Sequence, residues 1–246
     1  MPQRPTPASA PAATGRGVVG ALLVAVLAVA VVLAWRPVGD WVEAVGAPCG
    51  VEVDGERVPL DRDQARAATA EAARSLGGPG AGEAAPELPD GVVEAVLGAR
   101  ADTALTCRVP VPGPAAEDET GSGLTPRAQA VLDAVRTEVG DLPVGGFAPG
   151  GVASGHGEES THYEGRAVDV FFRPVTEEHL DDGWVLAQWL VSRADDLTVQ
   201  YVIFDDHYWG VRGSMRGWQD YRAPGDSDDP VLRHLDHVHV DVLRGE

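Results

Sequence analysis

The stretch "HVHVDVL", residues 237–243, decides how the second half of this 246-residue chain folds. Polar and apolar residues alternate in it without a break, which is typical of a β-strand with one buried face. We therefore predict a half-buried strand whose valines face a core. The opposite face then carries His237, His239 and Asp241 side by side.

A second strand is predicted in "RAVDVFF", residues 166–172. Asp169 lies there between apolar residues, and a carboxylate in such surroundings is unfavourable unless it is paired or bound to a metal. His162 precedes it in a turn through Gly165, and glycine permits a backbone conformation or a close approach that a Cβ would block. The spacing predicts that a loop histidine and a strand carboxylate converge.

Helices and strands mix in this half without a regular alternation. Thr125 is a good helix N-cap and Pro126 suits the first helical position, which predicts a helix from there. Apolar spacing predicts a second helix over residues 176–194, and a buried strand follows over residues 197–204. The fold class expected is α+β, with a small, mainly antiparallel sheet and flanking helices.

The chain divides into five segments by composition. Residues 1–16 are a disordered tail, and residues 48–108 are a small α/β module with a hairpin and a helix. Residues 109–123, rich in proline, glycine and acidic residues, form a linker to the domain at 124–246. The remaining segment, residues 17–35, precedes the module.

Residues 17–35 carry no charge over nineteen positions. A helix needs about 20 apolar residues to cross a bilayer, so we predict a single transmembrane anchor. Arg16 precedes the segment, while Asp40 and Glu43 follow it, which places the tail in the cytoplasm and the rest outside. A cleavable signal peptide is the alternative, although its apolar part is usually only about 7–15 residues long.

The two cysteines and the net charge narrow the class of protein further. Cys49 and Cys107 bracket the module, and outside the cytoplasm they are expected to form a disulfide; two buried thiols are the alternative. The formal net charge is −19. A nucleic-acid partner is therefore not expected, because binding a phosphate backbone requires clustered basic residues.

His162, Asp169 and His239 are the predicted metal ligands. Two imidazoles and one carboxylate are a ligand set of catalytic zinc sites, which leave one position open for water. The alternative is a polar strand face that contains histidines by chance. His156, in "SGHGEES", is expected to lie in a solvated polar loop, and the alternative is that it assists the site.

Two motifs in this half resemble those of a known family. The first is S-x-H-x-x-G-x-A-x-D, and the second is D-H-V-H at residues 236–239. Together they resemble the LAS metallopeptidases, named for lysostaphin, D-Ala-D-Ala peptidases and sonic hedgehog. The chain is most similar to the D-alanyl-D-alanine carboxypeptidase-like branch, and to membrane-anchored actinobacterial proteins that carry such a domain. The resemblance covers about residues 124–243, and its first motif consists of Ser160, His162, Gly165, Ala167 and Asp169.

The resemblance implies a hedgehog-like fold and a role for each site residue. Zn²⁺ would be held by His162, Asp169 and His239. Asp236 would be the general base, and His237 would stabilise the transition state. The base role requires a bend between residues 236 and 237, because Asp236 and His239 have opposite strand parity. Hydrogen bonds that orient the ligands are expected from Ser160 and Asp241.

The function that these expectations describe is hydrolysis of peptidoglycan stem peptides by an extracytoplasmic, membrane-anchored zinc peptidase. The bilayer would be contacted through residues 17–35. An alternative is a catalytically inactive metal-binding domain that binds a cell-wall peptide or a protein partner. Ala148 favours that alternative, since many relatives carry an arginine for substrate in the corresponding place.

Overall fold

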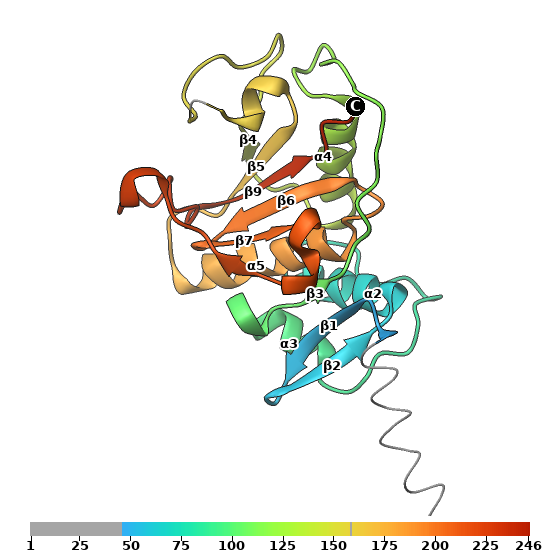
Figure 1. Ribbon diagram of the computed structural model, residues 1–246. Coiled ribbons are helices and arrows are strands. Elements are labelled where there is room, and N and C mark those ends of the chain that lie inside the picture. The colour runs from blue at the N-terminus through green and yellow to red at the C-terminus, as the bar shows by residue number, and fades with distance from the viewer. Residues whose placement is uncertain (1–45, 158) are drawn as a thin grey trace, which may run out of the picture. The chain divides into compact units, whose positions relative to one another are not determined.

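The computed structural model describes residues 46–157 and 159–246 (Figure 1). Residues 47–246 form one compact unit. The predicted tail, residues 1–16, and the predicted anchor, residues 17–35, lie outside the described residues. Within the described part of the chain, every helix is too short or too polar to span a bilayer.

Two antiparallel sheets and four described α-helices build this unit, which confirms the α+β class with a mainly antiparallel sheet. The smaller sheet has the order β2-β1-β3, from Cys49–Val53 (β1), Glu56–Leu60 (β2) and Thr106–Cys107 (β3). The larger has the order β4-β5-β9-β6-β7-β8, from Val144–Gly145 (β4), Ala167–Phe171 (β5), Val199–Phe204 (β6), His207–Gly210 (β7), Gln219–Asp220 (β8) and His237–Val242 (β9). The helices are Arg62–Ala72 (α2), Val92–Gly98 (α3), Pro126–Glu138 (α4) and Glu177–Ser192 (α5). Short 3₁₀ helices are Ala73–Leu76 (η1), Ala101–Thr103 (η2), Thr161–Glu164 (η3), Val211–Arg216 (η4) and Pro224–Asp226 (η5).

The helices begin where their capping residues predict. Asp61 caps α2 and forms a capping box with Gln64. Thr125 caps α4, with Pro126 in the first helical turn. Thr176 caps α5, where its side chain accepts a hydrogen bond from the backbone N–H of His179. These caps satisfy backbone N–H groups that have no partner inside a helix.

Strand β9 lies at the centre of the large sheet, paired with β5 on one side and β6 on the other. Its valines face the core as predicted, but all six of its residues are buried, so the prediction of a half-buried strand is wrong. The polar face is covered because other side chains pack on it; the ring of His234 contacts those of His237 and His239. The histidines of β9 are therefore enclosed rather than solvated.

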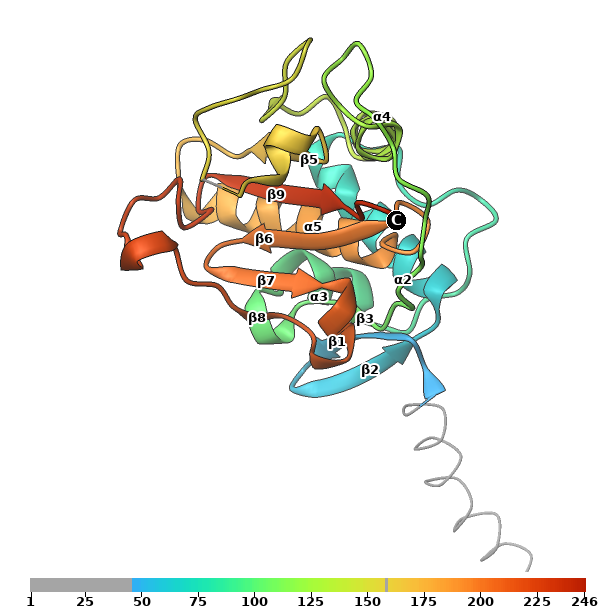
Figure 2. The ribbon, with the colours of Figure 1, turned by 45° about the horizontal axis from the view of Figure 1, so that its top comes forward.

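Helix α5 contacts both the large sheet and the N-terminal elements α2, α3 and β3 (Figures 1 and 2). Its buried Gln188 accepts a hydrogen bond from the Leu105 N–H (2.8 Å) and donates one to the Val96 carbonyl (2.8 Å). The disulfide between Cys49 and Cys107 is confirmed, and it joins β1 to β3. Residues 47–123 and the large sheet thus share one core.

Gly183, in the middle of α5, packs against an aromatic ring. A Cβ built there would lie 2.1 Å from Phe204 Cζ. Ala normally stabilises a helix interior by about 1 kcal/mol relative to Gly. We predict the opposite sign here, because overpacking a core destabilises it by about 1–3 kcal/mol. Urea unfolding of Gly183→Ala measures the effect.

Gly98→Ala is the matched control for this prediction. Gly98 is exposed at the end of α3, and nothing lies within 4 Å of an added Cβ. Its replacement should leave the free energy of unfolding unchanged or slightly raised. Equal changes for the two variants would contradict the proposed packing of Gly183 on Phe204.

Candidate metal centre

Asp169 is the centre of a cluster of buried histidines. Its Oδ1 lies 3.2 Å from His162 Nε2, 3.1 Å from His239 Nδ1 and 3.7 Å from His237 Nε2. Asp169 and His239 are directly opposite each other in the pairing of β5 with β9. The structure therefore brings together the three predicted ligands, His162, Asp169 and His239.

The short helix η3 aims His162 at Asp169. Its N-cap is Ser160, whose hydroxyl accepts a long hydrogen bond (3.4 Å) from the His162 backbone N–H. Its C-cap is Gly165, which has a φ of 61° and donates its N–H to the His162 carbonyl (3.1 Å). A Cβ at Gly165 would lie 2.8 Å from the Gly123 carbonyl oxygen, so this position needs glycine for both conformation and space. The hydrogen bond expected from Ser160 is therefore made to the His162 backbone N–H and not to the His162 ring.

Gly146 forms part of the wall of the site. It has a φ of +81°, and a Cβ there would lie 2.3 Å from His162 Cε1 and 3.0 Å from Asp169 Oδ2. The backbone of residue 146 thus packs directly on two predicted ligands. His162 Nδ1, on the same side of the ring, is buried without a hydrogen-bond partner. Because the Nδ1 side of the ring faces the Gly146 backbone, Nε2, which faces Asp169 Oδ1, is the His162 nitrogen available to a metal.

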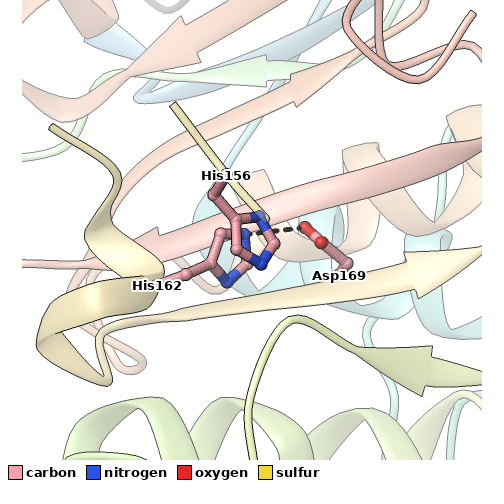
Figure 3. A group of neighbouring side chains, drawn as sticks. All are labelled: His156, His162 and Asp169. Atoms are coloured by element: carbon pink, nitrogen blue, oxygen red, sulfur yellow. Dashed lines mark ion pairs between the residues drawn. The ribbon is translucent and has the colours of Figure 1, made fainter. Parts of the chain in front are cut away.

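His156 is half-buried and reaches the site, which favours the alternative that it assists the site over a purely solvated loop. Its ring stacks on that of His162, with centroids 4.0 Å apart and an interplanar angle of 26° (Figure 3). One ligand atom from each of His156, His162 and Asp169 lies within 4.8 Å of the others, so this group could hold a metal ion. The loop returns His156 to the site through tertiary structure, and no residue spacing in the sequence signals it.

Asp236 and His237 form a hydrogen-bonded pair next to Asp169. The chain bends at residues 235–236, and β9 begins at His237. Asp236 Oδ1 lies 2.7 Å from His237 Nδ1, and its Oδ2 accepts a hydrogen bond from Arg173 Nε (2.6 Å). The carboxylate therefore fixes His237 with its Nε2 toward Asp169.

The two carboxylates of the site are held ionised. Burial alone would raise the pKa of Asp169, but hydrogen bonds to His162 and His239 outweigh it and keep that pKa well below its ordinary value. Burial likewise opposes ionisation of Asp236, yet His237 and Arg173 lower its pKa. Both side chains thus offer negative charge at neutral pH.

His234 and Asp241 are two further titratable residues near the site. The His234 ring contacts those of His237 and His239, and Asp241 lies on β9 two residues after His239. Burial, with the nearby His239 and His237, lowers the pKa of His234 to about 3, so its ring is neutral. Asp241 is fully buried, and burial raises its pKa to about 7. Asp241 accepts a hydrogen bond from the Tyr201 backbone N–H (3.1 Å), and the Tyr201 ring stacks on His239. Asp241 therefore supports the neighbour of a predicted ligand, and within residues 46–157 and 159–246 it makes no hydrogen bond to a predicted ligand.

Comparison with known protein families gives a similarity over part of the chain. Residues 120–231 are similar to a family described as VldE, C-terminal domain. The matched stretch contains His156, His162 and Asp169 and ends before β9. No curated protein and no solved structure matches the chain.

Proposed function

We propose that this chain is a zinc peptidase that hydrolyses an amide bond of peptidoglycan stem peptides. The observation that carries the proposal is the single oxygen, Asp169 Oδ1, that lies within 3.2 Å of nitrogens of both His162 and His239. These residues come from three segments of the chain and are all buried. The substrate class comes from the resemblance of the two motifs to LAS metallopeptidases.

The donor chemistry and the distances support zinc. Imidazole nitrogens favour transition metals, whereas Mg²⁺ and Ca²⁺ prefer oxygen ligands alone. Tetrahedral ligands about 2.0–2.1 Å from zinc lie roughly 3.3 Å apart. The separations of Asp169 Oδ1 from His162 Nε2 (3.2 Å) and His239 Nδ1 (3.1 Å) agree with that value. Zinc, when bound in such a site, acidifies water and polarises a carbonyl group, which is the chemistry that amide hydrolysis needs.

The pair of Asp236 and His237 is placed to move the proton. His237 Nε2 points toward Asp169 Oδ1, and its Nδ1 is held by Asp236. An imidazole fixed in this way can take a proton from the attacking water through Nε2. The same nitrogen then gives the proton to the leaving amine as the C–N bond breaks. Asp236 is better suited to orient His237 than to act as the base itself, since Arg173 and His237 lower its pKa.

The location of the enzyme belongs to the same proposal. An anchor over residues 17–35 would hold the domain on the outer side of the cell membrane, where peptidoglycan lies. The disulfide between Cys49 and Cys107 supports this location, because disulfides persist in oxidising compartments. The formal net charge of −19 supports a partner other than nucleic acid.

A second candidate function is metal-dependent binding without hydrolysis. His156 favours it, because a third nearby imidazole could complete a closed coordination shell of the kind found in structural zinc sites. In that case the domain would bind a cell-wall peptide or a protein partner.

Asp236→Asn tests the catalytic proposal. It preserves the size of the side chain and removes the charge that orients His237. Zinc binding should remain, while kcat for cleavage of a synthetic stem peptide should fall by about 10²–10⁴-fold, the usual contribution of acid–base catalysis. Metal content measured beside product formation separates the two effects.

The matched control for this test is Asp229→Asn, which changes an exposed loop carboxylate. Chelator-sensitive cleavage by the parent and the control, lost in Asp236→Asn, supports the peptidase. Zinc binding by the parent without cleavage of any stem peptide would support the binding function instead.

A further inference from the structure

The main chain of His156 is held on both sides by one hydroxyl group. Tyr163 Oη donates a hydrogen bond to the His156 carbonyl (2.7 Å) and accepts one from the His156 N–H (3.0 Å). Tyr163 follows His162 directly, so η3 carries both a predicted ligand and the group that fixes His156. The position of His156 is therefore fixed by Tyr163, the residue next to the predicted ligand His162.

The ring of His156 is half-buried and contacts two rings of η3. It stacks on the His162 ring at 4.0 Å and meets the Tyr163 ring edge-on at 6.0 Å. Its ligand atom lies within 4.8 Å of those of His162 and Asp169. Figure 3 shows the two imidazoles together, with the Asp169 carboxylate pointing toward them.

His239 approaches the same carboxylate from β9. Its Nδ1 lies 3.1 Å from Asp169 Oδ1, and its ring is 4.9 Å from that of His162. His156 and His162 thus form one group with Asp169, and His239 joins that group through Asp169 Oδ1. A four-coordinate zinc ion bound by all four has no position left for water.

We propose that His156 is a fourth protein ligand, so that the metal in the resting protein is held by His156, His162, Asp169 and His239. The inference rests on the metal site of the proposed function and adds its regulation. In this arrangement hydrolysis requires His156 to leave the metal, and the loop that carries it sets the fraction of open sites. A substrate or partner that binds the open form would raise that fraction.

The test compares His156→Ala with the parent in the full-length chain. Zinc affinity is measured by competition with a chromophoric chelator, and coordination is followed by the visible spectrum of the Co²⁺-substituted protein. Loss of a ligand should weaken zinc binding by at least about 10-fold, the lower end of what even outer-shell changes cost. The Co²⁺ bands should change in position and intensity as water replaces the imidazole. An unchanged affinity with an unchanged spectrum overturns the inference.

Two further variants make the comparison specific. Tyr163→Phe keeps both imidazoles and removes the hydroxyl that fixes His156, so it should change affinity and spectrum in the same direction but by less. His207→Ala removes a histidine of β7 outside the cluster and should change neither. A loss of affinity in His207→Ala equal to that in His156→Ala would also overturn the inference.

Hydrolysis at saturating zinc separates this inference from the proposed function. His156→Ala should cleave a stem peptide about 10-fold faster than the parent if release of His156 requires about 1.4 kcal/mol. Slower cleavage by the variant contradicts the inhibitory role. If neither protein cleaves the peptide, the proposed function fails, while affinity and spectrum still decide whether His156 is a ligand.

Discussion

Asp169→Ala should abolish stoichiometric zinc binding and, with it, hydrolysis. Asp169 Oδ1 is the atom that His162, His239 and His237 all approach, so its removal leaves imidazoles with no shared oxygen. The affinity loss should exceed the about 10–100-fold that changes around a ligand produce. Metal analysis after gel filtration gives the stoichiometry, and a stem-peptide assay gives the activity.

Asp220→Ala is the control for this experiment. Asp220 is an exposed carboxylate of β8, in the same sheet but outside the cluster. The Asp220→Ala variant should bind one zinc ion per chain, as we expect of the parent. If Asp169→Ala also bound one zinc ion with parental affinity, the metal centre would have to lie elsewhere.

Gly146→Ala should damage the metal centre although residue 146 offers no ligand. The added Cβ would lie 2.5 Å from His162 Nδ1 and 2.3 Å from its Cε1, which a real contact does not allow. The His162 ring must then move away from Asp169 Oδ1. Ligand geometry matters on the scale of about 0.5 Å, so zinc affinity should fall by 10-fold or more. Chelator competition and the Co²⁺ spectrum measure the change.

Gly150→Ala separates this clash from backbone strain. Gly150 has a φ of +85°, close to the +81° of Gly146, but nothing lies within 4 Å of a Cβ there. Both variants should lose about 1–2 kcal/mol of stability from the left-handed conformation. Only Gly146→Ala should lose zinc affinity, and an equal loss in both variants would attribute the effect to strain alone.

Much of the large sheet was predictable because its signals are local. The alternation in residues 237–243 predicted β9, and Thr125 with Pro126 predicted the start of α4. The enclosure of β9 was not predictable, since it depends on partners such as His234 that pack from a loop with a positive φ. Likewise, no local pattern predicts the hydrogen bonds that join Gln188 of α5 to residues 96 and 105.

The site divides in the same way. His162, Asp169 and His239 could be predicted because turn spacing and strand parity place them on one side of paired strands. The contact between Asp236 and His237 depends on a bend before β9. The expected role of Asp236 required such a bend, but no residue pattern predicts it. His156 and Gly146 lie in a glycine-rich segment whose path is set by tertiary contacts such as those of Tyr163. Periodicity carries no information about such a path.

The buried amide of Gln188 has a consequence for dissecting this protein. Cutting the chain ahead of residue 124 would remove the Leu105 N–H and the Val96 carbonyl, leaving that amide without two of its partners. Each orphaned polar group in an apolar interior costs about 1–3 kcal/mol. Trp189 and Leu190, on the same helix, belong to the core that both halves build. A fragment that starts near residue 47 keeps these partners, whereas residues 124–246 expressed alone should aggregate.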